Sequence, residues 1–389
     1  MLAYPPETPE MAPATLIPLS RPSYDEREIT RIREALRGRT AGDGPFGQRV
    51  ERRLEAQLGV TRVLLTTSCT HALELALMAL GLTKGQEVIV PSFTFVSTAN
   101  AVLRAGARLV LADIEEETLG LDPADVERRL TERTAALLPV HYAGIAAQMG
   151  PLLAIAQRRG LKLIEDAAQG IGASWRGRPL GSLGDAGCLS FHDTKNLSCG
   201  EGGALALHDE ETARRAEIIR EKGTNRSAFL RGEVDKYTWV AEGSSYILSD
   251  VLAAILDAQL DKQEEIAARR GAIAARYREA LSDWARAKGV RLCPELPERG
   301  LNHHIFYLRL PDAAAQARCL ASLNAQSVGA AFHYVPLHSS PFGRSLGLAG
   351  ADFPRSERVA ATLVRLPIHA EMSDADVERV VFAARASLG

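Results

Sequence analysis

The sequence lacks the features that would place the protein in a membrane or on a nucleic acid. No apolar run among its 389 residues approaches the length of a bilayer-spanning helix. Acidic and basic residues nearly balance, at 48 and 46, and the formal net charge is −2. No excess of one charge therefore attracts nucleic acid or an anionic membrane. We expect no nucleic-acid partner and no membrane partner.

Cysteine is scarce, and the spacing of the cysteines matches neither a disulfide framework nor a zinc site. The chain has five cysteines, an odd number, and none forms a C-x-x-C pair: Cys69, Cys188, Cys199, Cys293 and Cys319. This argues against a disulfide framework and against a zinc cluster, and it indicates a reducing compartment. The N-terminus also lacks the apolar segment of a signal peptide. We predict a cytoplasmic protein without a bound metal, with residues 1–16 as a poorly ordered N-terminus.

The pattern of apolar residues predicts an α/β fold. Short β-rich runs alternate with helical runs, which is typical of a mostly parallel sheet covered by helices on both faces. Residues 249–281 are rich in Ala, Glu and Arg and predict a helix that leads out of the sheet. We predict a large domain at residues 17–260 and a smaller C-terminal α/β domain at residues 261–389. The predicted strands cover residues 63–65, 87–91, 108–112, 135–140, 161–164, 187–191 and 204–207, and the helices before the long one cover residues 25–36, 49–58, 71–80, 98–104 and 149–159.

Three polar stretches follow predicted strands at the edge where ligands of α/β sheets bind. The first, residues 67–71, offers hydroxyls and free N–H groups at a helix N-terminus, which suits a phosphate or simply caps the helix. The second ends in Glu165 and Asp166, where a carboxylate is structural or binds a metal or a ribose. The third carries Ser190 and Lys195 before a glycine-rich turn, and a single lysine there is typical of a solvated loop.

Together, the three stretches indicate a more specific chemistry. Pyridoxal phosphate needs an anion site, a partner for its pyridinium nitrogen and an amine for a Schiff base. A lysine buried beside such a cofactor becomes nucleophilic because desolvation favours its neutral form. A dinucleotide site is disfavoured, since Gly170 and Gly172 do not belong to a full G-x-G-x-x-G that opens a helix.

The chain also resembles a known family. Residues 17–367 resemble the DegT/DnrJ/EryC1/StrS family of pyridoxal-phosphate sugar aminotransferases, most clearly in residues 220–226 and 231–246. The resemblance implies the fold of type I pyridoxal-phosphate transferases and a homodimer with shared active sites. Within the family the sequence is most similar to transaminases that make dTDP-4-amino-4,6-dideoxygalactose for surface polysaccharides. A family dehydratase is disfavoured because those enzymes replace the lysine with histidine.

The resemblance implies roles for individual residues. Lys195 would carry the Schiff base and move the proton, and Asp166 would pair with the pyridinium nitrogen. Many relatives have Asn where this chain has Ser245, and that Asn reaches the phosphate of the neighbouring subunit. The other cofactor residues implied are Gln169 near the ring, Phe95 on the ring face, and Thr70, the His71 backbone and Ser190 at the phosphate.

The substrates implied are L-glutamate and dTDP-4-keto-6-deoxy-D-glucose, aminated at C4 to dTDP-4-amino-4,6-dideoxy-D-galactose. Two alternatives stay open: another keto sugar or a cyclitol as acceptor, and a non-catalytic protein that uses the fold for binding. A basic segment is a candidate for the pyrophosphate, although each of its residues is also compatible with a solvated face. The candidate substrate residues are Arg220, Lys222, Arg226, Arg231, His192, Tyr334 and His338, with His333, Lys236 and Tyr237 as weaker ones.

Overall fold

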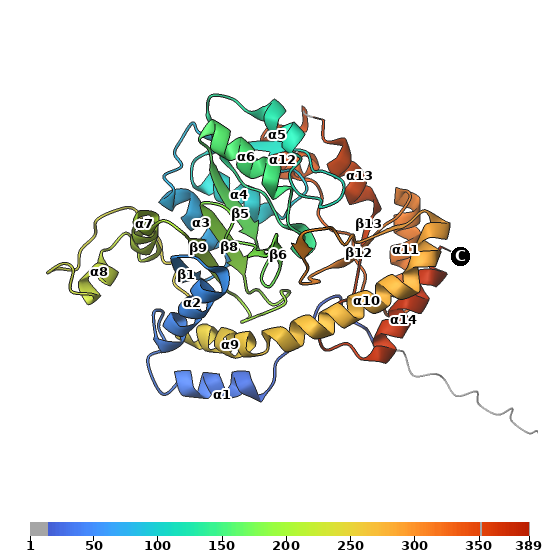
Figure 1. Cartoon of the computed structure of the whole chain (residues 1–389), viewed down its shortest axis with the longest axis horizontal. Coiled ribbons are helices and arrows are strands. Elements are labelled where there is room, and N and C mark those ends of the chain that lie inside the picture. The colour runs from blue at the N-terminus through green and yellow to red at the C-terminus, as the bar shows by residue number, and fades with distance from the viewer. Residues whose placement is uncertain (1–14, 351, 389) are drawn as a thin grey trace, which may run out of the picture.

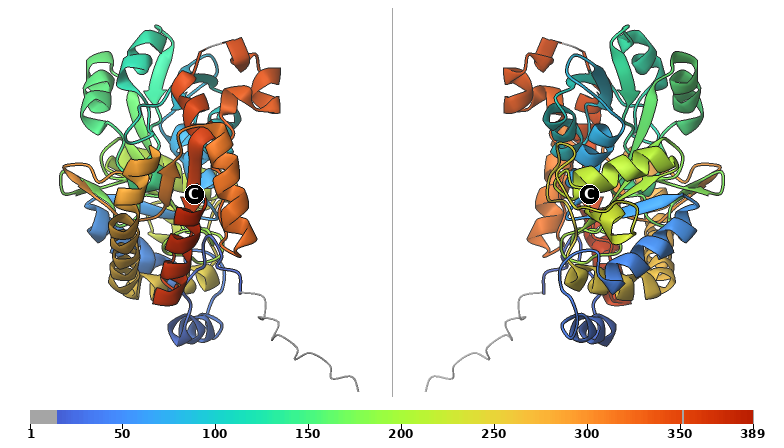
Figure 2. Two further views of the ribbon diagram at one scale, coloured as in Figure 1. Left: turned by 90° about the vertical axis from the view of Figure 1, so that its right-hand side faces the viewer. Right: turned by 90° about the vertical axis from the view of Figure 1, so that its left-hand side faces the viewer.

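The computed structural model describes residues 15–350 and 352–388, and the prediction for residues 1–14 lies outside this part of the chain. Figure 1 shows a large sheet wrapped by helices, connected by the long helix α10 (Gln263–Lys288) to a smaller sheet with its own helices. The left view of Figure 2 looks onto the smaller part, where α11 (Ala313–Ala325) and α14 (Asp374–Ala386) stand side by side.

The large sheet has seven strands in the order β1-β9-β8-β5-β4-β2-β3. Only β9 runs against the others, since it pairs antiparallel with both β1 and β8. The predicted α/β class with a mostly parallel sheet is therefore confirmed. The strands are β1 (Arg62–Thr66), β2 (Glu87–Pro91), β3 (Arg108–Ala112), β4 (Thr134–Leu137), β5 (Lys162–Ala167), β8 (Ala186–Ser190) and β9 (Gly203–Leu207).

Helices cover both faces of this sheet. Successive side chains of each strand point to opposite faces, so the strands contribute to a core on each side. On β1, Leu64 joins the core under α3 (Cys69–Ala79), α4 (Val96–Arg104) and α7 (Glu210–Arg220), whereas Val63 and Leu65 join the core under α2 (Pro45–Leu58) and α9 (Asp250–Asp261). Farther along, α5 (Pro123–Arg129) and α6 (Met149–Arg159) cover the second face. The remaining elements are α1 (Glu26–Ala35), the α8 turn (Arg226–Leu230), the short strands β6 (Ser174–Trp175), β7 (Arg178–Pro179) and β11 (Arg299–Gly300), the 3-10 turns η1 (Tyr142–Gly144), η2 (Leu337–Ser339) and η3 (Leu348–Gly350), α12 (Pro341–Ser345) and α13 (Pro354–Thr362).

Strand β5 is longer than the sequence suggested, and this corrects the position of its two acids. Glu165 and Asp166 lie inside the strand, which ends at Ala167, so their side chains point to opposite faces. Glu165 accepts N–H bonds from Gly181 (2.9 Å), Leu183 (2.6 Å) and Gly184 (2.9 Å), and its carboxylate lies 2.8 Å from His141 Nε2. Glu165 therefore holds the loop between β5 and β8, and Asp166 alone is left for a ligand.

The smaller part is built around an antiparallel sheet of β10 (Arg291–Leu292), β12 (Phe306–Arg309) and β13 (Leu363–Leu366). Tyr277 of α10 packs on Phe306, and this core extends to α11 and α14. Ile17 belongs to the same core and pairs with Val328. The segment around Ile17 therefore packs on the smaller part, although the following residues belong to the large sheet and its helices. Residues 328–334 form only isolated bridges in the smaller part. The boundary at residue 260 stays a prediction.

Glu165 gives a prediction about stability and pH. Burial raises the pKa of its carboxyl, but hydrogen bonds from His141, Gly181 and Gly184 outweigh burial and hold the pKa below its ordinary value of 4.5. The ionised group therefore stabilises the fold above that pH, and its contribution is lost as the pH falls through the lower pKa of the folded protein. Glu165→Gln should reduce the free energy of unfolding at neutral pH by about 3 kcal/mol, because one acceptor oxygen is replaced by an NH2 donor that faces buried N–H groups.

Denaturant unfolding of the two proteins at several pH values measures this difference. The difference in free energy of unfolding between the two proteins should become smaller in acid. A difference that becomes larger there would contradict the structural role of the ionised Glu165. Glu127→Gln is the matched control, since Glu127 is exposed and pairs only with Arg158 at the surface.

Candidate active site

A cavity of about 640 Å³ lies where the carboxyl ends of β5 and β8 face the smaller sheet. The large domain contributes Thr70, Asp166 and Lys195 to its wall, and residues 331–334 and Arg365 come from the smaller part. The structure thus brings together most of the residues that the sequence predicted for a cofactor.

The N-terminus of α3 forms one part of the cavity wall. Ser68 caps this helix by accepting the N–H of His71 (3.2 Å), whereas the first-turn N–H groups of Cys69 and Thr70 have no partner within the helix. Thr70 donates its hydroxyl to Ser97 (2.8 Å), and Ser190 stands at the end of β8 in the same wall. The His71 N–H is thus taken by the cap, and the His71 ring stacks on Tyr246 with centroids 4.6 Å apart.

Glycine is required where β9 passes this helix end. A Cβ atom on Gly203 would lie 2.3 Å from the Ser68 carbonyl carbon and 2.4 Å from the Cys69 nitrogen. No side chain fits at that distance, so Gly203 lets the strand approach the helix N-terminus closely.

Asp166 is buried at the floor of the cavity, with 5% of its surface exposed. Burial raises the pKa of its carboxyl, although a hydrogen bond from the Thr98 hydroxyl (2.8 Å) and the positive charge of Lys195 act in the opposite direction. Thr94 lies 2.8 Å from the Thr98 hydroxyl and extends this chain of hydrogen bonds. The sequence analysis did not identify Thr98 as a site residue, because only the fold brings α4 beside β5.

Lys195 points its amine into the same cavity. Its loop is anchored to the smaller part, since the Asn196 amide donates to the Asn302 carbonyl (2.8 Å) and contacts His304 Nδ1 (2.9 Å). Within the described residues, Lys195 Nζ forms no hydrogen bond and no ion pair. Burial lowers the pKa of this amine, and the negative charge of Asp166 only partly offsets that shift. The geometry is that of an amine available for nucleophilic and proton-transfer chemistry.

Aromatic and amide groups form another part of the cavity wall. Gln169 accepts the Ala143 N–H (2.6 Å) and donates to the Tyr334 hydroxyl (3.2 Å), which fixes the orientation of its amide. His333 stacks on Tyr334 with centroids 3.6 Å apart. Phe95 stands at the mouth with 55% of its surface exposed, next to α4.

Two predicted substrate residues lie elsewhere, which corrects the prediction. Arg220 is buried in ion pairs with Asp43 (2.7 Å) and Glu51 (2.9 Å), and its guanidinium also donates to the Leu65 carbonyl. It therefore holds α7 to the sheet and is not free to bind a pyrophosphate. His338 is buried as well, with its ring nitrogens 2.6 Å from Ser92 Oγ and 2.8 Å from Glu357, and it is outside the cavity wall.

The other basic candidates belong to a projecting segment that we call the arm, residues 221–245. Arg226 pairs with Glu221 (2.9 Å) and Arg231 with Glu217 (3.0 Å), whereas Lys222 and Ser245 are exposed. None of these four lines the cavity of its own chain. His192 does line the mouth, where it lies 3.6 Å from Glu201.

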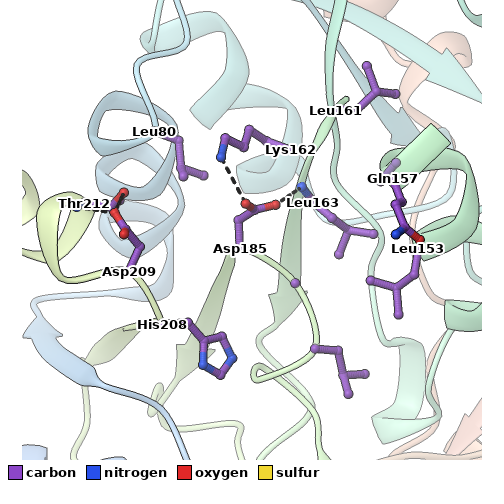
Figure 3. Close-up of a pocket in the computed structure, with 13 residues that line it drawn as sticks. Leu80, Leu153, Gln157, Leu161, Lys162, Leu163, Asp185, His208, Asp209 and Thr212 are labelled. Carbon is purple, nitrogen blue, oxygen red and sulfur yellow. Dashed lines mark hydrogen bonds and ion pairs between the residues drawn. The ribbon is translucent and has the colours of Figure 1, made fainter. Parts of the chain in front are cut away.

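A second cleft, of about 390 Å³, lies at the opposite end of the sheet, where β5 and β8 begin (Figure 3). Its charged groups are engaged with one another: Lys162 Nζ lies 3.1 Å from Asp185, and Asp185 also accepts the Leu163 N–H (2.8 Å). Asp209 caps α7 through Thr212. These contacts give the polar residues of the cleft a structural role. The candidate catalytic groups therefore lie in the larger cavity.

The residues of the larger cavity fit pyridoxal phosphate. Thr70, Ser190 and the close passage at Gly203 suit the phosphate, the buried Asp166 suits the pyridinium nitrogen, and the unpaired Lys195 amine suits the aldehyde. The buried carboxylate and the half-buried amine are each unfavourable alone, and such a ligand would compensate both.

The hydrogen bond between Thr98 and Asp166 gives a prediction about the cofactor. Thr98→Val removes a donor that stabilises the ionised carboxylate while keeping the side-chain shape, so the pKa of Asp166 should rise. Affinity for pyridoxal phosphate, measured by fluorescence titration of the apoprotein, should fall about tenfold. Thr94→Val is the graded control, because Thr94 reaches Asp166 only through Thr98, and its effect should be smaller. Equal affinities in all three proteins would refute this role.

Comparison with known proteins identifies the family. The model of the DegT/DnrJ/EryC1/StrS aminotransferase family matches residues 22–385. The spore coat polysaccharide biosynthesis protein SpsC of Bacillus subtilis is 34% identical over 378 residues, covering 95% of this chain and 96% of that protein. The crystal structure of the aminotransferase TlmJ from Streptoalloteichus hindustanus has a TM-score of 0.88 at 32% identity and covers 96% of this chain and 99% of its own.

A putative sugar aminotransferase from Streptococcus pneumoniae, Spr1654, solved in its PMP form, has a TM-score of 0.88 at 25% identity, covering 96% of this chain and 97% of its own. These matches extend over nearly the whole chain, and they agree with the cofactor chemistry of the cavity. The protein belongs to the DegT/DnrJ/EryC1/StrS family of pyridoxal-phosphate-dependent aminotransferases.

Proposed function

We propose that the protein transfers the amino group of L-glutamate to C4 of a nucleotide-linked 4-keto-6-deoxy sugar. The specific reaction proposed converts dTDP-4-keto-6-deoxy-D-glucose to dTDP-4-amino-4,6-dideoxy-D-galactose in the cytoplasm, for a surface polysaccharide. The observation that carries the proposal is the convergence of Lys195, Asp166 and the α3 N-terminus on one cavity. A polysaccharide-biosynthesis relative and a putative sugar aminotransferase support a sugar as acceptor.

Different residues of the cavity would hold different parts of the cofactor. Thr70, Ser190 and the first turn of α3 would hold the phosphate, Phe95 and Gln169 would contact the ring, and Asp166 would keep the ring nitrogen protonated. When bound, pyridoxal phosphate supplies a ring that accepts electrons from the carbon next to the transferred nitrogen. The burial of Asp166 strengthens its interaction with the ring nitrogen, because few waters compete for the carboxylate.

Lys195 is the proton carrier of the proposal. Its Nζ removes a proton from the α-carbon of glutamate in the first half of the reaction and returns a proton to C4 of the sugar in the second. The lowered pKa of this amine suits the role, since a larger fraction is neutral and able to accept a proton near neutral pH. In the first half, one water supplies the keto oxygen of 2-oxoglutarate, and in the second half the ketone oxygen of the sugar leaves as water, so the overall exchange is balanced.

The decisive experiment supplies L-glutamate and dTDP-4-keto-6-deoxy-D-glucose to the purified enzyme and identifies the amino sugar by mass and NMR. Lys195→Ala should lower turnover at least about 10³-fold, because it removes the amine to which the proposal assigns proton transfer. Lys195→Arg keeps the positive charge, but its guanidinium stays protonated near neutral pH and cannot accept a proton, so this variant should be as inactive. Faster amination of a 3-keto sugar or a cyclitol ketone would favour the alternative acceptors, and activity retained in Lys195→Ala would refute the mechanism.

We further propose that two copies form a dimer through the arm, with Ser245 of one subunit near the phosphate site of the other. The arm leaves the body of the protein (Figure 1) and exposes apolar side chains that a monomer would leave in water. The exposed fractions are 43% for Phe229, 63% for Leu230, 53% for Tyr237, 76% for Trp239 and 50% for Val240.

A variant of the arm tests the dimer. Trp239→Ser should raise the dimer dissociation constant about tenfold or more, since a buried tryptophan at an interface contributes strongly to binding. Sedimentation at a series of protein concentrations measures the constant. Phe382→Ser is the matched control, because Phe382 is 71% exposed on α14, away from the arm. A monomeric wild-type protein, or equal constants for the two variants, would contradict the proposal.

A further inference from the structure

Arg365 is a cavity residue that the proposed chemistry has not used. It lies on β13, opposite Tyr307 of β12, and its N–H donates to the Ala331 carbonyl (2.8 Å). Neighbouring strands therefore hold its backbone on both sides. Its side chain lines the cavity together with Lys195, His333 and Tyr334.

The guanidinium of Arg365 is poorly satisfied by the protein. Its only hydrogen bond to the described residues runs from Nη2 to the Phe332 carbonyl (3.2 Å), it forms no ion pair with them, and its Nε is buried without an acceptor. Arg309 on the adjacent strand also has a buried Nε without an acceptor, but it donates to the Glu116 carbonyl (2.8 Å) and lies near the Glu116 carboxylate. A guanidinium without a carboxylate is costly inside a protein, and a ligand would remove that cost.

The charges around Arg365 favour an anion. Arg365 and Lys195 are the only lysine or arginine residues in the described cavity wall, which contains two acids, Asp166 and Glu201. Asp166 is engaged by Thr98, and Glu201 lies at the mouth beside His192. Burial lowers the pKa of His333 to about 2, so this neighbour of Arg365 stays neutral near neutral pH. Arg365 therefore carries the positive charge on this part of the cavity wall.

The chemistry of the two substrates decides which anion it is. In an α-amino acid the carboxylate is bonded directly to the carbon that reacts at Lys195, so it must lie deep in the cavity. In a nucleotide-linked sugar the pyrophosphate is attached at C1, across the ring from the C4 ketone, so it must lie toward the mouth. Arg365 shares the cavity wall with Lys195, and its positive charge is close enough to lower the pKa of the lysine amine, which matches the first arrangement.

We propose that Arg365 binds the α-carboxylate of the amino-acid donor and of the oxo-acid product. The inference rests on the proposed amino transfer, but it concerns the donor alone. A guanidinium presents parallel N–H groups that match the two oxygens of a carboxylate. Arg365 is thus the residue that sets the orientation of the donor over the lysine.

The test separates the two half-reactions. Arg365→Gln and Arg365→Lys are made in the holoenzyme, and Arg309→Gln is the control from the adjacent strand. The dissociation constant of 2-oxoglutarate is measured by calorimetry without turnover, and that of L-glutamate from the change of the cofactor absorbance. Arg365→Gln should raise both about 10- to 100-fold, Arg365→Lys should raise them less, and the KM of the keto sugar should stay within about twofold.

Wild-type enzyme provides a second measurement that requires no variant to fold. L-Glutamate α-amide, which lacks the α-carboxylate charge, should bind about 10- to 100-fold more weakly than L-glutamate, and Arg365→Gln should remove most of this difference. An unchanged donor constant in Arg365→Gln, or a loss confined to the sugar nucleotide, would overturn the proposal. If the keto sugar is not aminated, the proposed acceptor is wrong, while donor binding still tests Arg365.

Discussion

The structure depends on keeping a carboxylate and an amine, Asp166 and Lys195, in one buried cavity without pairing them. Burial raises the pKa of Asp166 and lowers that of Lys195, so each group is driven toward its neutral form. Few groups of the protein bind them. The Thr98 hydroxyl and the Ala168 N–H donate to Asp166, and no described residue forms a hydrogen bond with the lysine amine. This arrangement is unfavourable in the free protein. A cofactor that pairs with both groups removes this cost, which favours its binding.

The sheet order explains how these groups meet. β5 lies in the middle of the sheet beside β8, and β9 and β1 follow, so Asp166, the lysine loop and the N-terminus of α3 share one edge. The antiparallel β9 runs back from the lysine loop and passes α3 at Gly203, where only glycine fits. The smaller part closes the cavity from the other side, and Asn196 connects the lysine loop to it through Asn302 and His304.

Much of this could be predicted from the sequence, because strands buried on both faces and their following polar loops leave a strong local pattern. The α/β class, the strands and the three loops follow from that pattern. The strand pattern alone did not separate the roles of Glu165 and Asp166, since the end of β5 depends on its pairing with β8, and only the family resemblance assigned Asp166 to the pyridinium nitrogen. Arg220 looked like a free cation because its partners Asp43 and Glu51 are remote in sequence. Thr98 and Arg365 carry no local signal, and only the packing of α4 and β13 brings them to the cavity.

In the proposed reaction one cavity serves an amino-acid donor and a keto sugar in turn, and the two parts of its wall suit different tasks. The large domain supplies the lysine, the acid and the phosphate site, which both half-reactions need. The smaller part supplies Tyr334, His333 and Arg365, which do not belong to the predicted phosphate or pyridinium contacts. If Arg365 binds the donor, a carboxylate of the protein beside it would compete with that of the donor. The absence of an acceptor for its Nε among the described residues agrees with this proposal, in which the smaller part recognises the donor and the loops of the large sheet hold the cofactor.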